Sequence, residues 1–226
     1  WTDVDGMLTA DPRTVEDARL IEHIRFDEAA ELASFGAKVL HPSTIAPAVR
    51  RGIPVYVYNS RRPSGAGTRI TAEAPRRQVS AIAGKPGISV VKVRSSRMLL
   101  AHGFLRRFFE VFERYQTSVD VVATSEVSVS VTVDDAARLD DLVMDLAALG
   151  DVSIERSRAI IAVVGAALGG HSRTMSQALA ALGDIPVHMV SLSASQINLT
   201  IIVDDEQLAP AMRALHTAFF PPAARA

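Results

Sequence analysis

The first fifteen residues carry side chains that could handle a phosphate group. Asp3, Asp5 and Asp11 precede Arg13 in a stretch interrupted by glycine and proline. Closely spaced carboxylates on a loop could orient a phosphate-bound magnesium ion, and an arginine can contact phosphate oxygens with two N–H groups. By spacing alone a structural interpretation is favoured, in which Asp11-Pro12 forms a turn and the other carboxylates accept loop hydrogen bonds.

Lys38 follows a glycine at the end of an expected helix, within the segment FGAKVLHP that begins at Phe35. A lysine there could contact a phosphate as a point charge, although most such lysines are simply solvated. His41 has no second histidine or carboxylate at ligand spacing, so we expect a structural role for it and no metal site. The glycine-rich nucleotide motifs GxxxxGK[ST] and GxGxxG are absent from the sequence.

A second group of residues could bind a small amino acid. Gly103 lies where a helix should begin, and the free N–H groups of a helix N-terminus favour a carboxylate. Asp120 and Glu126 flank a short strand pattern and could hold ammonium groups. By spacing alone they could equally be exposed charges at strand ends. The corresponding positions about 70 residues later are His188 and Gln196, so a cationic ligand should prefer the first copy.

These residues belong to an approximate tandem repeat. The two copies are VDVVATSEVSVSVTVDD from Val119 and VHMVSLSASQINLTIIVDD from Val187, offset by 68 residues at their start and 70 at their end. Both alternate apolar and polar residues as half-buried strands do, and each follows an apolar strand and a helical pattern. The element order in each copy is β-α-β-β-α, which is typical of the ferredoxin-like fold.

The second copy lacks a fourth strand, because only six residues follow its last expected helix at 205–220. The strand-like segment 79–83 has no role in the first copy and could supply the missing partner. We therefore expect the first unit to be inserted in the second. The expected domains are residues 1–75, an α/β portion; residues 84–157, the first ferredoxin-like unit; and residues 78–83 with 158–220, the second.

The composition excludes several classes of function. The 226 residues carry 24 basic and 25 acidic side chains, so no global positive field would hold a nucleic acid or an anionic membrane. The absence of cysteine excludes disulfides and thiolate chemistry and fits a cytoplasmic protein. No apolar run is long enough to span a bilayer. Because the first residue is Trp1, we expect the chain to be cut from a longer one.

The segments WTDVDGMLTADPR, FGAKVLHP, RMLLAHGFL and VDVVATSEVSVSV together resemble aspartate kinases, particularly the lysine-sensitive bacterial kind. The resemblance covers nearly the whole chain. It implies an amino-acid-kinase domain followed by two ACT domains, which are βαββαβ modules that bind amino-acid effectors. It also implies transfer of the γ-phosphate of ATP, with Mg²⁺, to the β-carboxylate of L-aspartate, in the pathway to lysine, threonine and methionine.

The resemblance assigns roles to particular residues. Those that match the family's ATP site are Thr2, Asp3, Leu8, Arg13 and Lys38, where Leu8 replaces a tyrosine found in some members. Those that match the inhibitory lysine pocket are Met98, Ala101, Gly103, Phe104, Leu105, Val119, Asp120, Ser125 and Glu126, where Ala101 replaces a serine found in some members. The family's Lys-Phe-Gly-Gly segment and its aspartate-binding residues would precede Trp1, so we expect no turnover from these residues alone.

The expected parent protein is a cytoplasmic, feedback-inhibited kinase that forms a homodimer through its ACT domains. Its small-molecule partners would be L-aspartate, ATP and the effector L-lysine. The alternative from another class is a stand-alone amino-acid-binding regulatory protein in which residues 1–70 are a docking remnant. A different ACT-bearing enzyme, such as a dehydratase or dehydrogenase, is disfavoured because FGAKVLHP lies in the kinase portion.

Overall fold

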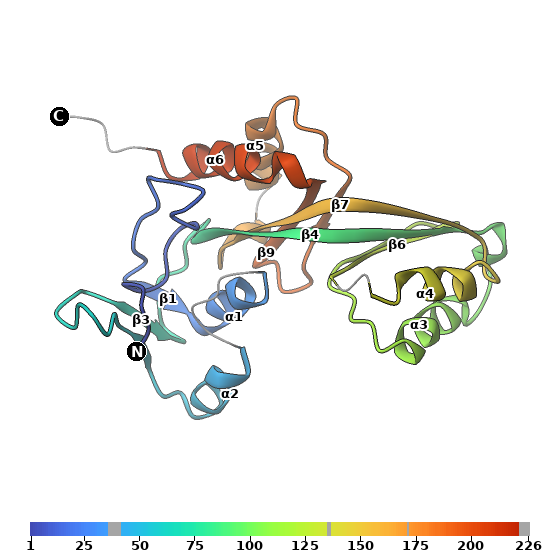
Figure 1. Ribbon diagram of the computed structural model, residues 1–226. Coiled ribbons are helices and arrows are strands. Elements are labelled where there is room, and N and C mark those ends of the chain that lie inside the picture. The colour runs from blue at the N-terminus through green and yellow to red at the C-terminus, as the bar shows by residue number, and fades with distance from the viewer. Residues whose placement is uncertain (36–41, 135–136, 171, 222–226) are drawn as a thin grey trace.

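The computed structural model describes residues 1–35, 42–134, 137–170 and 172–221. Its N-terminal portion is α/β, and Figure 1 shows it in blue and cyan below the larger sheet. A three-stranded sheet has the order β1-β3-β2, with β1 parallel and β2 antiparallel to β3. The elements are β1 (His23–Arg25), α1 (Phe26–Ser34), α2 (Pro42–Arg51), β2 (Val55–Val57) and β3 (Thr68–Thr71). Lys38 and His41 lie outside the described residues.

The rest of the chain forms a six-stranded antiparallel sheet in the order β5-β6-β4-β7-β9-β8. Its strands are β4 (Ala81–Arg94), β5 (Val122–Thr124), β6 (Ser128–Val133), β7 (Asp151–Val164), β8 (Met189–Leu192) and β9 (Asn198–Asp204). Its helices are α3 (Phe104–Arg114), α4 (Leu139–Leu146), α5 (Ser172–Leu182) and α6 (Leu208–Phe219). The helical pattern expected at 205–220 thus begins with a 3₁₀ turn at Asp205–Gln207.

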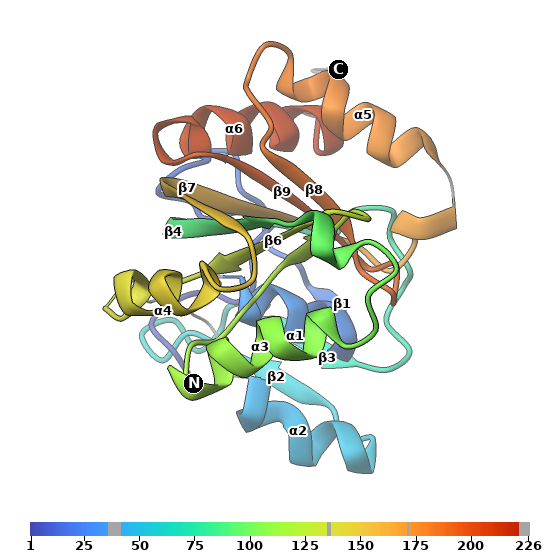
Figure 2. The same cartoon turned by 90° about the vertical axis from the view of Figure 1, so that its right-hand side faces the viewer.

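Two strands of 14 residues, β4 and β7, run through the centre of this sheet. Figures 1 and 2 show them side by side, with helices near both ends. The sequence analysis expected 79–83 as a strand-like segment of the second unit, separate from the first unit that begins at residue 84, and Gly84-Lys85-Pro86-Gly87 follows that segment directly. In the structure, β4 continues through these four residues because its register irregularity and the positive φ of Gly87 (73°) absorb the disturbance.

The pairing of β4 with β7 is relevant to the expected insertion of the first ferredoxin-like unit in the second. Ala81 pairs with Val164 and Lys85 with Ile160, so the first part of β4 lies beside the apolar strand of the second repeat. The second part of β4 lies between β6 and the first part of β7. Each half of the sheet therefore has four strands. The assignment of these halves to two ACT domains, with the boundaries given above, stays a prediction.

Three apolar clusters fill the space around the sheet. Val91 and Val93 of β4 pack with α3 and α4, and Ile82 packs with α5 and α6. Ala81 and Ala83, on the other face from Ile82, join a cluster with Phe26, Ala29 and Leu32 of α1. The alternation along β4 thus distributes neighbouring side chains among separate cores. Figure 2 shows the α5/α6 and α3/α4 pairs on opposite sides of the long strands.

The N-terminal portion is joined to the sheet by buried polar contacts. Glu28 of α1 is fully buried, and its Oε1 accepts hydrogen bonds from Ser80 Oγ (2.6 Å) and the Ala166 N–H (2.8 Å). The Ile82 N–H donates to the carbonyl of Thr9 (2.8 Å) at the start of β4. These bonds connect segments that are far apart in the sequence. A displacement of β4 would therefore disturb hydrogen bonds of the N-terminal portion.

Candidate nucleotide and effector sites

Thr2 and Asp3 lie beside the segment that follows β2. The Thr2 N–H donates to the carbonyl of Tyr58 (3.0 Å), and the carbonyl of Thr2 accepts from the Ser60 N–H (2.8 Å). The Thr2 hydroxyl donates to Asp3 Oδ1 at 3.3 Å, and both side chains are open to solvent. The backbone is thus fixed while the hydroxyl and the carboxylate can reach a ligand.

Arg13 lies on a different loop. Leu8 forms an isolated antiparallel bridge with Leu20, and this bridge closes the loop that carries Arg13. Val15 of the same loop packs into the cluster of α5 and α6. Thr2 and Asp3 are therefore held by the β2–β3 connection, whereas Arg13 is held on a loop that packs against the larger sheet.

The guanidinium of Arg13 is bound by Asp11. Arg13 Nη2 lies 2.7 Å from Asp11 Oδ2, and Arg13 Nε lies 3.0 Å from Asp11 Oδ1. Hydrogen bonding and Coulombic attraction to Asp11 raise the pKa of Arg13 above its ordinary value. Since 79% of the Arg13 side chain is exposed, an anion can approach the guanidinium from solvent. Asp11 thus positions Arg13, which sequence spacing did not indicate.

A second polar group near Thr2 was also missed by sequence reasoning. Asp5 Oδ1 accepts from Asn59 Nδ2 (2.7 Å), and Asp5 Oδ2 accepts from Arg62 Nη2 (2.6 Å). Asn59 is buried, and Trp1 lies against Tyr58 with ring centroids 5.6 Å apart. The partners are more than 50 positions apart in the sequence, so no local spacing could have predicted this group.

Residues expected in the effector pocket come from two segments around α3. Phe104, at the first turn of α3, is buried, and Met98, Ala101 and Val119 pack against the same apolar cluster. Gly103 caps the helix with a left-handed backbone (φ 77°), which is why glycine suits this position. Leu105 is 39% exposed on the outer side of the helix. The structure thus brings four of the expected residues into one cluster.

The polar members of the expected pocket lie along the β5–β6 hairpin. The Asp120 N–H donates to the carbonyl of Thr132 (3.2 Å) just before β5. Beyond β5, the Ser125 and Ser128 hydroxyls are 2.7 Å apart, and Glu126 is exposed in the turn. Asp120 and Glu126 therefore stand at opposite ends of β5, and Asp120 is the one beside the centre of the large sheet.

The side chain of Lys85, in β4, forms an ion pair with the carboxylate of Asp120. Its Nζ lies 2.9 Å from Asp120 Oδ2 and also forms an ion pair with Asp134. Burial by itself lowers the pKa of Lys85, but hydrogen bonds to Asp134 and Asp120 outweigh it, so the net change is a raised pKa. Burial and the nearby Asp120 raise the pKa of Asp134, against the effect of Lys85. Sequence reasoning missed Lys85, which is 35 positions from Asp120.

The second half of the sheet has a related charge cluster. Arg158 Nη1 lies 2.7 Å from Asp204 Oδ1, and His188 Nε2 lies 3.0 Å from the same oxygen. Glu155 of β7 lies next to this cluster, with its Oε2 3.6 Å from Arg158 Nε. Its Oε1 lies 2.5 Å from Nζ of Lys92, which belongs to the other half of the sheet. Burial opposes ionisation of Glu155, but the hydrogen bond from Lys92 and the neighbouring positive charges lower its pKa. His188 and Asp204 are the repeat counterparts of Asp120 and Asp134.

No group of three or more His, Asp or Glu side chains in the described part of the chain is placed to hold a metal ion. Among its helices, none combines the length and the apolar character needed to cross a membrane.

Comparison with family models defines the class of protein. Residues 1–59 match the amino acid kinase family, and residues 161–219 match an ACT domain. The chain thus combines amino-acid-kinase sequence before the large sheet with an ACT domain inside it.

Individual relatives narrow this class. The chain is 40% identical over 233 residues to aspartokinase 3, chloroplastic, of Arabidopsis thaliana, and 37% identical over 229 residues to lysine-sensitive aspartokinase 3 of Escherichia coli K12. Both alignments cover 97% of this chain, but 42% and 51% of the respective relative. The chain therefore spans about half the length of these curated relatives.

Solved structures agree with this result. Escherichia coli aspartokinase III in complex with aspartate and ADP matches with a TM-score of 0.88 and 36% identity, over 97% of this chain and 51% of that one. A C-terminal regulatory domain of aspartate kinase from Porphyromonas gingivalis W83 is 40% identical, with a TM-score of 0.56, over 62% of this chain and 96% of that one. The chain belongs to the aspartokinase family.

Proposed function

We propose that this chain carries the regulatory region and one edge of the nucleotide site of an aspartate kinase. The enzyme would transfer the γ-phosphate of ATP to the β-carboxylate of L-aspartate, with L-lysine as feedback inhibitor. The observation that carries this proposal is the continuous match to aspartokinases over 97% of the chain. One of these relatives is a lysine-sensitive aspartokinase, and the structure of another was solved in complex with aspartate and ADP.

At the nucleotide edge, Thr2, Asp3, Leu8, Arg13 and Lys38 would line the ATP site. Arg13 is exposed and permanently charged, so it can neutralise phosphate oxygens, and Asp11 holds its guanidinium in place. Bound magnesium would take most of its ligands from phosphates and water, which fits the exposed carboxylate of Asp3 as a partner for that water. Phosphoryl transfer needs charge neutralisation around the whole transferred group, so we expect no turnover from these residues alone.

At the effector site, the aliphatic part of L-lysine would lie on the cluster of Met98, Ala101, Phe104 and Val119. Its carboxylate would face the helix N-terminus at Gly103, and an ammonium group would bind Asp120. Leu105, which is exposed on α3, and Ser125 and Glu126, which lie in the hairpin turn, would complete the proposed pocket. Glu126 would contact the second ammonium group.

The wider arrangement follows from the same proposal. Each half of the large sheet would be an ACT domain, with residues 84–157 inserted between segments 78–83 and 158–220 of the second. The strand pairing of Ala81 with Val164 supports this insertion. The enzyme would be a cytoplasmic homodimer joined through its ACT domains and would serve lysine, threonine and methionine biosynthesis.

Calorimetric titration tests the effector role directly. We expect this chain to bind L-lysine with micromolar to millimolar affinity and to show no binding of L-threonine or L-methionine under the same conditions. Asp120→Asn should abolish lysine binding, and Glu126→Ala should weaken it more than twofold, because each removes an ammonium partner.

A matched control is Glu110→Ala on α3, whose exposed carboxylate pairs only with Arg106 of the same helix among the contacts described (3.4 Å). It should bind lysine like the unchanged chain. Binding of threonine in place of lysine would contradict the assigned effector. Silence with all three amino acids would contradict an effector pocket in this chain.

A further inference from the structure

The proposed effector site already contains an ammonium group supplied by the chain itself. Lys85 Nζ donates to Asp120 Oδ2 at 2.9 Å and also to Asp134 Oδ2. Asp120 is the carboxylate that the proposed function assigns to the ammonium group of L-lysine. An incoming lysine and Lys85 therefore present the same chemical group to the same oxygen atoms.

The site is open enough for an exchange of partners. The side chains of Lys85 and Asp120 are 24% and 27% exposed, and that of Asp134 is 46% exposed. One positive charge faces two carboxylates, so the cluster keeps a net charge of about −1 and attracts a further cation. Lys85 can give up Asp120 without becoming an isolated buried charge, because Asp134 remains beside it.

We propose that Lys85 is an internal competitor of the basic effector, so that L-lysine binds by replacing the Lys85 ammonium at Asp120 while Lys85 stays paired with Asp134. This inference rests on the proposed effector function. It adds that Lys85 sets the concentration of L-lysine at which the site becomes occupied. The effector must break one ion pair before it makes its own. The affinity of the site for L-lysine is thus lower than the pocket alone would give.

The second half of the sheet indicates which contact is the exchangeable one. There Arg158 lies at 2.7 Å from Asp204, the counterpart of Asp134, while His188 stands at the position of Asp120. A bond between a cation of the long strands and the last residue of the hairpin is therefore common to both halves. Arg158 also faces a second carboxylate, Glu155 of β7 at 3.6 Å. The difference between the halves is therefore the carboxylate at the start of the hairpin, Asp120, where the other half has His188.

The position of Lys85 also couples the exchange of ion-pair partners at Asp120 to the N-terminal portion. Lys85 lies in the regularly paired part of β4, directly before its register irregularity, and Gly87 follows with a φ of 73°. Three residues earlier, the Ile82 N–H donates to the carbonyl of Thr9 in the loop that carries Arg13 (2.8 Å). Release of Lys85 from Asp120 would thus act on a strand that is bonded to the nucleotide-site loop.

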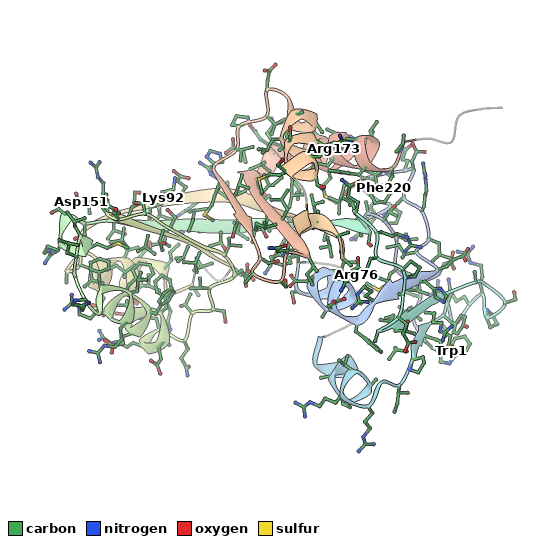
Figure 3. All side chains as sticks on the ribbon, turned by 180° about the vertical axis from the view of Figure 1, so that it is seen from behind. Trp1, Arg76, Lys92, Asp151, Arg173 and Phe220 are labelled. Atoms are coloured by element: carbon green, nitrogen blue, oxygen red, sulfur yellow. The ribbon has the colours of Figure 1, made fainter. Side chains whose placement is uncertain are left out.

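The test compares two lysines of the same strand. Lys85→Met removes the ammonium group and keeps an unbranched apolar side chain, whereas Lys92→Met does the same at the ion pair with Glu155 (2.5 Å). Figure 3 shows Lys92 near Asp151, on the part of the strands that leads toward α3 and α4. Lys85→Arg keeps the positive charge. Each variant is titrated with L-lysine by calorimetry at pH 8 in the same buffer.

We expect Lys85→Met to bind L-lysine about tenfold more tightly than the unchanged chain, because the competitor is gone and two carboxylates are free. Lys85→Arg and Lys92→Met should bind within about twofold of the unchanged chain. In addition, the ¹⁵Nζ and ¹³Cε resonances of Lys85 should shift on addition of L-lysine, and those of Lys92 should not.

The outcomes separate this inference from the effector function. Equal affinity of Lys85→Met and the unchanged chain, or weaker binding by the folded variant, would overturn the competition while the effector site stands. If L-lysine binds neither protein and circular dichroism shows both to be folded, the proposed effector function itself is wrong, and the competition falls with it.

Discussion

The buried imidazole of His216 joins two segments that are 207 residues apart in the sequence. Its Nε2 lies 2.9 Å from the hydroxyl of Thr9, and that hydroxyl also accepts the N–H of Arg19 (2.9 Å). Only 2% of the residue is exposed. Burial, with a smaller effect from the positive charge of Arg19, lowers the pKa of His216.

This lowered pKa predicts a loss of stability on mild acidification. Between the lowered pKa of the folded state and the ordinary value of about 6.5, the unfolded chain binds more protons, so the free energy of unfolding falls as the pH falls. One pKa unit corresponds to about 1.4 kcal/mol, which sets the scale of the effect. Urea unfolding at pH 7.5 and 5.5 measures it.

His216→Phe should lower the free energy of unfolding at both pH values, because Thr9 loses a partner. It should also make the free energies of unfolding at pH 7.5 and pH 5.5 more alike. His102→Gln, which changes an exposed histidine, should leave the difference between the two free energies unchanged. An unaltered pH dependence in His216→Phe would show that other groups cause the acid sensitivity.

Single residues also mark how far the sequence alone could be interpreted. Met98, Ala101 and Phe104 were expected in one site because of the resemblance of RMLLAHGFL to aspartate kinases, and in the structure they belong to one apolar cluster. Lys85 could not be expected there, because its partners are 35 and 49 positions away. Asp11 and Arg13 are only two positions apart, yet their spacing did not show which of several loop conformations the backbone adopts.

At the scale of elements, α1 connects the N-terminal portion to the large sheet through two carboxylates, those of Glu28 and Glu31. Glu28 accepts hydrogen bonds from Ser80, from the Ala166 N–H and from the Arg25 N–H (3.2 Å), and it is fully buried. Neighbouring Glu31 accepts from Asn198 Nδ2 at 2.9 Å. The helix is thus bonded both to the entry of β4 and to the end of β7.

Glu28→Ala should destabilise the protein strongly, because it leaves three donors without their acceptor. Each buried unsatisfied group costs about 1–3 kcal/mol, and partial access of water reduces the sum, so we expect a loss of about 3 kcal/mol. Glu31→Ala is the matched control on the same helix and should cost about 1 kcal/mol. Equal losses in the two variants, measured by urea denaturation, would contradict the role assigned to Glu28.

Helix α3 shows which elements a sequence can predict well. Phe104, Phe108, Val111 and Phe112 recur at helical spacing, and all four are buried in the structure. The continuity of β4 was not predictable in the same way, because glycine and proline ordinarily interrupt strands. Cross-strand pairing with β7 on both sides of the irregularity holds β4 together, and such a partner, about 70 residues away, leaves no local signal.

At the scale of the whole molecule, β4 and β7 make the two halves of the large sheet parts of one unit. Each strand contributes residues to the α3/α4 core and to the clusters on the other half. Two modules joined by a flexible linker could unfold one at a time. Two modules that share their central strands should unfold together, because melting one half unpairs the strands of the other.

Phe108→Ala tests this cooperativity. Phe108 of α3 is fully buried in the half that contains β5 and β6. The substitution should cost about 3–5 kcal/mol. If the halves unfold together, hydrogen exchange of the Ile201 and Ile202 amides in β9 should lose the same free energy of protection as the amides of β6. Met144→Ala, at a side chain that is mostly exposed (69%), should change neither.

Protection of β9 that stays unchanged in Phe108→Ala would mean that the halves unfold independently despite their shared strands. A common loss would have a functional consequence. Ligand bound in the β5–β6 half would then stabilise the whole sheet by mass action, including the β4 segment that is bonded to Thr9. The exchange measurement can be repeated with L-lysine present. It would show whether ligand bound at the effector site increases the protection of amides in β9 and β4, through the strands that both halves share.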